Sequence, residues 1–146
     1  MRARYIGAAA AAILAAVALT GCSSQAGSSE LTVTPAAGSA HSVSIDDVTC
    51  LTVSGKFTAS SAERVGDLPQ FVATATASTQ RTTTWLHLDD DSWFMSTGAF
   101  THDDGTVTFD GVEGKLGTSS GDDYPTQFDG AATIEGTVSC TSEKEL

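Results

Sequence analysis

One cysteine of this chain stands where a lipid-attachment reaction needs it. Residues 19–22 read Leu-Thr-Gly-Cys and close an apolar run. In bacterial lipoprotein signals, the thiol at this position takes a diacylglyceryl group, and cleavage before the cysteine frees an amino group for a further acyl chain. Two or three chains anchor stably, because each buried methylene contributes about 0.8 kcal/mol and one chain alone is marginal. We therefore predict that Cys22 is lipidated.

The segment before Cys22 has the layout of an export signal. Arg2 and Arg4 supply the positive start, and an apolar stretch follows from Ile6 to Leu19. This stretch is shorter than the roughly 18 residues that indicate a membrane-spanning helix. We predict a signal peptide over residues 1–21 and a protein held in the cell envelope, on the extracytoplasmic face of the cell membrane. The alternative is an ordinary signal with a chance cysteine, which would release a soluble domain.

The other two cysteines, Cys50 and Cys140, are the natural candidates for a disulfide. The chain has 3 cysteines, and lipidation of Cys22 accounts for the odd one. An exported domain folds in an oxidising compartment, where a disulfide persists. A redox-active or metal-binding pair is disfavoured, because there is no Cys-x-x-Cys spacing and no nearby histidine. We predict a Cys50–Cys140 disulfide that closes a loop of about 90 residues.

The chain is acidic, with a formal net charge of -11. Loss of Arg2 and Arg4 with the signal takes this charge from -11 to -13. Nucleic-acid binding requires clustered lysine and arginine, and no two of the remaining basic residues are adjacent. The same acidity disfavours direct docking on anionic headgroups. We expect no nucleic-acid partner, and contact with the membrane through the acyl chains on Cys22.

Residue types that support catalysis or metal binding occur without a recognisable pattern. The histidines are His41, His87 and His102, and no Gly-x-Ser-x-Gly elbow accompanies the many serines. The acidic runs at 89–91 and 102–104 lack the register of a calcium loop. They also flank a predicted strand, which would hold them far apart. We expect no enzymatic activity, no metal and no cofactor.

The chain after the signal divides into a tether and one domain. Residues 22–42 are rich in Ser, Ala and Gly, which predicts a flexible tether. Over residues 43–146, short Val-, Thr-, Phe- and Trp-bearing runs alternate with Asp, Gly and Pro turns. This pattern predicts a single all-β domain whose antiparallel sheet forms a small sandwich or partial barrel. We also predict a helical turn over 60–65 and a β-bulge at Asp110-Gly111, with a tight Asp-Gly hairpin as the alternative.

A cavity between the strands would give the domain a second use, as a carrier of a lipid or other apolar ligand. Its lining would come from Trp85, Trp93, Phe94, Met95, Phe100 and Phe109. The competing interpretation makes these side chains the core, because a small domain has little apolar surface to spare. We favour the core.

In layout the chain resembles the mycobacterial LpqH-type surface lipoprotein antigens. The resemblance lies in Leu-Thr-Gly-Cys-Ser-Ser at 19–24, the small-residue tether, Val-Thr-Cys at 48–50 and the closing strand at 132–140. It implies an actinobacterial cell-envelope lipoprotein with a small β-rich domain and acyl chains visible to host Toll-like receptors. Only Cys22, Cys50 and Cys140 are matched positions, and the family brings no catalytic residues. We therefore predict a lipid-anchored, non-enzymatic binding or structural module, with an apolar-ligand carrier as the alternative.

Overall fold

The structure, a computed structural model, describes residues 29–89, 91–119 and 123–146. The predicted signal peptide, Cys22 and the start of the predicted tether lie outside the described residues. Across the described ranges, no helix has the length and apolar character needed to cross a membrane. The regular elements found there are β-strands.

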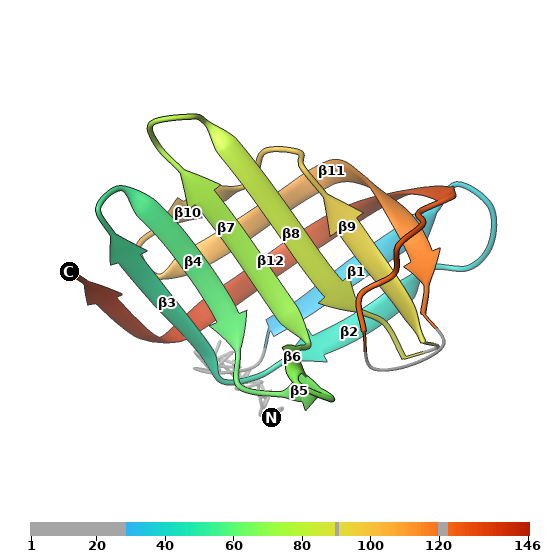
Figure 1. Cartoon of the computed structure of the whole chain (residues 1–146), viewed down its shortest axis with the longest axis horizontal. Coiled ribbons are helices and arrows are strands. Elements are labelled where there is room, and N and C mark those ends of the chain that lie inside the picture. The colour runs from blue at the N-terminus through green and yellow to red at the C-terminus, as the bar shows by residue number, and fades with distance from the viewer. Residues whose placement is uncertain (1–28, 90, 120–122) are drawn as a thin grey trace, which may run out of the picture.

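The strand order gives two layers of five strands each. The strands of the two layers cross at an angle (Figure 1). The front sheet has the order β3 (Val48–Val53), β4 (Lys56–Ser61), β7 (Phe71–Thr76), β8 (Arg81–His87) and β9 (Ser92–Ser96). The back sheet has the order β10 (Thr101–Asp103), β11 (Thr106–Thr118), β12 (Gly130–Glu145), β1 (Ser29–Pro35) and β2 (His41–Ile45). A small separate hairpin consists of β5 (Arg64–Val65) and β6 (Leu68–Pro69).

The two layers are joined along both sides. The end of β11 pairs with β9, and the end of β12 pairs with β3 in parallel orientation. Because β11 and β12 also pair with each other, the sheet closes on itself. The predicted all-β class with an antiparallel sheet in a sandwich or partial-barrel architecture is therefore confirmed. Among the strand pairs described, β3 and β12 run parallel, whereas the others run antiparallel.

Apolar side chains that alternate along the strands fill the space between the layers. Leu31 and Ile134 of the back sheet and Phe71 and Leu86 of the front sheet are fully buried. The rings of Phe71 and Phe109 meet edge to face across the layers, with centroids 6.2 Å apart. This geometry is favourable for aromatic pairs and adds to the burial of apolar surface.

The prediction of a flexible tether over residues 22–42 is wrong for residues 29–42. Residues Ser29–Pro35 form β1, which pairs with β12 on one side and β2 on the other. Leu31 and Val33 of β1 are fully buried in the core. The small residues on either side of this short alternating run hid a strand, and residues 29–42 belong to the folded domain.

Two local predictions had opposite outcomes. The helical turn predicted over 60–65 is wrong, because β4 continues to Ser61 and β5 follows at Arg64. The hydroxyl of Ser61 accepts a hydrogen bond from the Phe71 backbone N–H and donates one to the Glu63 carbonyl, which fixes an extended path. The predicted bulge is confirmed, since the β11–β12 register shifts between Phe109 and Val112.

Candidate functional site

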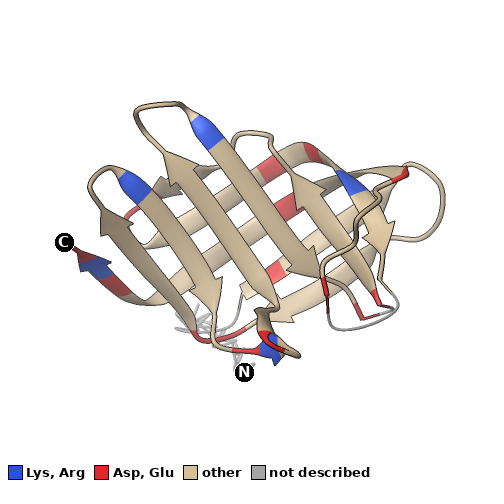
Figure 2. Ribbon diagram, in the orientation of Figure 1, with Lys and Arg blue, Asp and Glu red and all other residues tan. Residues whose placement is uncertain are grey.

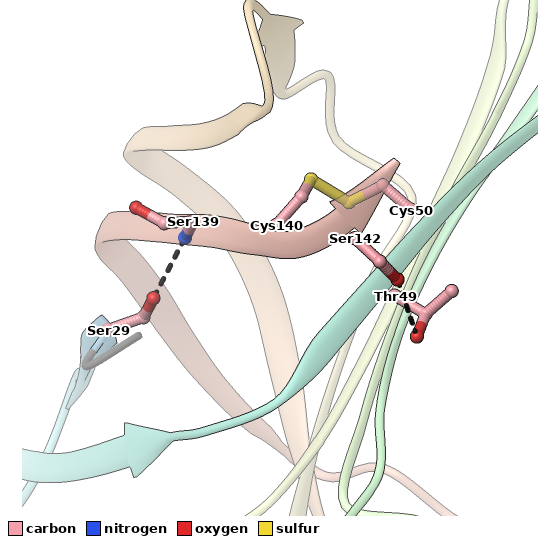
Figure 3. Close-up of a disulfide and its surroundings, with 6 residues drawn as sticks. All are labelled: Ser29, Thr49, Cys50, Ser139, Cys140 and Ser142. Atoms are coloured by element: carbon pink, nitrogen blue, oxygen red, sulfur yellow. Dashed lines mark hydrogen bonds between the residues drawn. A yellow bond between two sulfur atoms is a disulfide. The ribbon is translucent and has the colours of Figure 1, made fainter. Parts of the chain in front are cut away.

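The disulfide predicted from the cysteine count joins Cys50 of β3 to Cys140 of β12 (Figure 3). The two Cα atoms are 5.6 Å apart, and 90 residues separate the cysteines in the sequence. Beside the bridge, the register of β12 against β3 shifts between Cys140 and Ser142. The Ser142 hydroxyl donates a hydrogen bond of 3.3 Å to the Thr49 hydroxyl. The disulfide thus links β12, the last strand of the chain and a member of the back sheet, to β3 of the front sheet.

The histidines and acidic runs considered for chemistry lie in separate surroundings. His87 packs edge to face on Trp93, with centroids 4.9 Å apart. His102 stacks on Phe57 at 4.0 Å. Among the residues that the structure describes, no group of three or more His, Cys, Asp or Glu side chains is placed to hold a metal ion.

The side chains considered as a pocket lining are divided between core and surface. Phe94, Phe100 and Phe109 belong to the core between the sheets. Trp93 is fully buried, while Trp85 and Met95 are half-buried. Met95 lines a pocket of about 760 Å³ together with Pro35 and Ala132. A second, smaller pocket of about 390 Å³ is lined by Phe57, Ala75, Ala77 and Ala99 and contains none of the predicted lining residues.

The outer face of the front sheet presents side chains in cross-strand rows. Residues opposite each other in neighbouring strands point to the same face. The pairings place Leu51, Thr58, Thr74 and Thr83 in one row. A second row, two residues away from the first along each strand, contains Thr49, Ser60, Val72, Trp85 and Met95. On the other side, a third row contains Val53, Lys56, Thr76 and Arg81. We call these three rows the outer face.

The outer face is free of carboxylates in a strongly acidic chain. The sequence holds 18 Asp and Glu residues, yet the five front strands, all of which the structure describes, contain none. Figure 2 shows these strands without red, while the acidic residues lie on the back sheet and in the loops. The acidic and basic residues are therefore separated by surface, and the excess of acidic residues lies outside the outer face.

Basic residues lie in or beside the same outer face. Lys56 and Arg81 are exposed members of the third row. Lys144 of β12 pairs with Leu51, and Lys115 of β11 pairs with Met95, so both extend the rows at their ends. Of the five lysines and arginines in the described part of the chain, four therefore border this surface, and the fifth, Arg64, lies in the β5–β6 hairpin.

Hydroxyl groups occupy the centre of the outer face. Thr58, Thr74 and Thr83 lie opposite one another on three adjacent strands and are half-buried. Within the described residues, their side chains take part in no hydrogen bond. Each hydroxyl offers one donor and two acceptor positions. The row can therefore bind a polar ligand without breaking a hydrogen bond of the protein.

An aromatic cluster closes one end of the outer face. Residues 123–129, which lead into β12, cross over β9 in Figure 1, and we call them the strap. Tyr124 of the strap lies 4.4 Å from Trp85 and 4.7 Å from Trp93, ring centroid to centroid. Phe128 meets Trp85 edge to face at 5.7 Å. The strap covers Trp93 and leaves Trp85 half-buried at the border of the face.

Burial within this cluster changes the acidity of the tyrosine. Desolvation raises the pKa of Tyr124 above its ordinary value of 10.0, and the nearby positive charge of Arg64 opposes the shift. The phenol is therefore neutral at physiological pH and keeps its hydrogen-bonding proton at the edge of the outer face.

The chain was compared with protein-family models, with curated proteins and with solved structures, and none of the three comparisons gave a match.

The outer face itself was missed by sequence reasoning. Its signal was available, because residues 48–62 and 68–88 contain no acidic residue. The net charge of the chain does not reveal this separation. The segments without acidic residues form one surface only when β3, β4, β7 and β8 lie side by side.

Proposed function

We propose that this protein is an exported, lipid-anchored module of the cell envelope that binds a partner and carries out no chemistry of its own. The observation that carries the proposal is the use of the cysteines. The disulfide takes up Cys50 and Cys140, which leaves Cys22, directly behind the apolar segment, for acylation. The disulfide also suits an oxidising compartment outside the cytoplasm.

The binding role rests on the outer face. A charge-free row of threonines bordered by basic residues, in a chain of net charge -11, is a surface with its own chemistry. Surfaces of this kind direct partner choice through electrostatic complementarity. The acyl chains hold the domain at the membrane, and the residues between Cys22 and Ser29 connect the two parts. Like the LpqH-type antigens that it resembles, the lipidated protein would be visible to host Toll-like receptors through its acyl chains.

Membrane fractionation tests the anchor. The Cys22→Ala variant moves from the detergent-soluble membrane fraction to the aqueous fraction of an expressing actinobacterium. The double variant Cys50→Ala/Cys140→Ala serves as the control, because it removes two cysteines and keeps the acylated one in the membrane fraction. A Cys22→Ala protein that stays wholly with the membrane contradicts the proposal.

A carrier of an apolar ligand is the second candidate, and the pocket of about 390 Å³ at the end of the sandwich is the observation that favours it. Its walls include Phe57 and several alanines, and apolar walls of this kind suit an acyl or other hydrocarbon group. Native mass spectrometry of the purified protein distinguishes the two candidates. A co-purified lipid that is lost in Ala75→Leu supports the carrier, whereas protein of bare mass in repeated preparations counts against it.

A further inference from the structure

We propose that the outer face binds an acidic polysaccharide, a chain of sugar rings that carries carboxylate or phosphate groups. This inference rests on the proposed binding role and names the partner class. The chain of sugars would lie along the row of Thr58, Thr74 and Thr83, across the strands of the front sheet.

The row has dimensions that fit an extended polymer. Neighbouring strands lie about 4.8 Å apart, so the three hydroxyls form a regular line with a spacing close to the length of a sugar ring. Leu51 continues the line on β3. Each threonine offers a hydroxyl and a methyl group side by side, which match the alternating hydroxyl and C–H edges of a sugar. Trp85, in the next row, packs against Tyr124 and Phe128, so this aromatic cluster bounds the line on that side.

The basic residues surround the threonine row and supply the preference for an acidic chain. Lys56 and Arg81 precede Thr58 and Thr83 by two residues on the same face, about 6.6 Å along each strand. Lys144 stands at the end of the row, beside Leu51. Glu143 and Glu145, which flank Lys144 in sequence, line a separate pocket with Asp103 and Asp104. Anionic groups on a bound chain therefore meet three cations along the row.

Two other anionic partners fit this surface less well. Docking on an anionic membrane depends on basic residues gathered in one cluster, typically four to eight of them, whereas these cations are spread around a row of hydroxyls. Nucleic acids demand a basic patch or stripe and a basic domain, which a net charge of -11 opposes. A polymer that binds by many separate hydrogen bonds and a few ion pairs matches the distribution found.

A matched pair of polymers tests the proposal. The full chain, purified in a neutral detergent, is titrated with carboxymethyl cellulose and with hydroxyethyl cellulose, which share a backbone and differ in charge. The chain has 2 tryptophans, Trp85 in the outer face and Trp93 beneath the strap, and their fluorescence reports binding. We expect saturable binding of carboxymethyl cellulose, at least tenfold weaker binding of hydroxyethyl cellulose, and weakening by added salt.

Variants locate the binding surface. Thr74→Glu places a carboxylate in the centre of the threonine row and is expected to weaken binding at least tenfold. Ser42→Glu adds the same charge at an exposed position of β2 on the back sheet and is expected to bind like the parent. Lys56→Ser/Arg81→Ser removes two exposed cations without altering the core, so its weaker binding is independent of any effect of Thr74→Glu on folding.

The outcomes separate this inference from the proposed function. Equal binding by Thr74→Glu and Ser42→Glu overturns the assignment to the outer face, and absence of binding to carboxymethyl cellulose overturns the partner class. Binding to vesicles of phosphatidylglycerol and phosphatidylcholine, with the same dependence on Thr74 and no binding to the polymer, overturns it in favour of membrane docking. None of these results changes the distribution of Cys22→Ala between membrane and aqueous fractions, which tests the anchor alone.

Discussion

Cys50 and Cys140 lock the parallel junction between β3 and β12, one of the two sides along which the back sheet is joined to the front sheet. The bridge spans 90 residues of sequence, so it constrains most of the described domain in the unfolded state. It also holds β12 beside β3, and with it places Lys144 at the end of the threonine row. One covalent bond therefore supports both the closure of the fold and the composition of the outer face.

Removal of the disulfide will destabilise the domain. In the chain-entropy model, a closed loop of this length contributes about 4 to 5 kcal/mol. The variant Cys50→Ala/Cys140→Ala should lose about that much free energy of unfolding in urea denaturation. The parent protein should show a similar loss when the denaturation is repeated with reductant, and identical curves with and without reductant contradict the prediction.

The buried hydroxyl of Thr84 is a place where the core can be improved. Thr84 is fully buried, and its Oγ1 has no hydrogen-bond partner among the described residues. A buried polar group without a partner costs about 1 to 3 kcal/mol, and valine keeps the shape of threonine. Thr84→Val should therefore raise the melting temperature in a calorimetric scan.

Ser96→Ala is the matched control for Thr84→Val. The Ser96 hydroxyl is also buried, but it donates to the Glu113 carbonyl and accepts a hydrogen bond of 2.9 Å from the Gly98 N–H. Its loss should lower the melting temperature. A decrease for both variants would show that the Thr84 hydroxyl has a partner in solution.

Gly114 marks a close approach between β11 and β9. A Cβ atom at this position would lie 2.5 Å from the Met95 carbonyl oxygen and would overlap the Phe94 ring. Gly114→Ala should destabilise the domain by about 1 to 3 kcal/mol, the usual cost of overpacking. Gly130→Ala is the control, because its Cβ would meet only the Leu116 Cβ, at 3.5 Å. Equal unfolding midpoints for the two variants in urea would contradict this packing.

Tyr124 will make stability depend on alkaline pH. Its pKa is raised in the folded state, mainly by desolvation, so the folded protein favours the neutral phenol. This contribution is fully present below pH 10 and is lost as the pH rises through the folded pKa. The unfolding free energy should therefore fall above pH 10 in the parent and less steeply in Tyr124→Phe.

The acidity of Tyr124 can be measured directly. The sequence has 2 tyrosines, and Tyr5 lies within the predicted signal peptide, so the mature protein would contain Tyr124 alone. An absorbance titration at alkaline pH should give a single transition with a midpoint above 10. A midpoint at or below the ordinary tyrosine pKa of 10.0, measured on the folded protein, would contradict the burial of this ring.

Much of the fold follows from local sequence patterns. The closing strand at 132–140, the Asp, Gly and Pro turns and the pair Cys50 and Cys140 are predictions from the sequence that the structure contains. The slip at Asp110-Gly111 predicted the bulge, because an extra residue in one strand reverses the parity of every side chain after it.

The failures have a physical cause in tertiary pairing. Local sequence patterns do not reveal the strand Ser29–Pro35, because a short strand depends on β12 and β2 for its hydrogen bonds and on the core for burial of Leu31 and Val33. The outer face was equally hidden, since Thr58, Thr74 and Thr83 become neighbours only through strand order. Local patterns determine which way a side chain points, whereas strand order determines what lies beside it.

The most direct test of a lipid-anchored, disulfide-closed module is the intact mass of the protein extracted from membranes, measured before and after reduction and alkylation. We predict a mass that begins at Cys22 and includes two or three acyl chains. We also predict that Cys50 and Cys140 take up alkylating reagent only after reduction. An unacylated mass that includes Cys22, or two thiols that react without reduction, would contradict a lipid-anchored, disulfide-closed module.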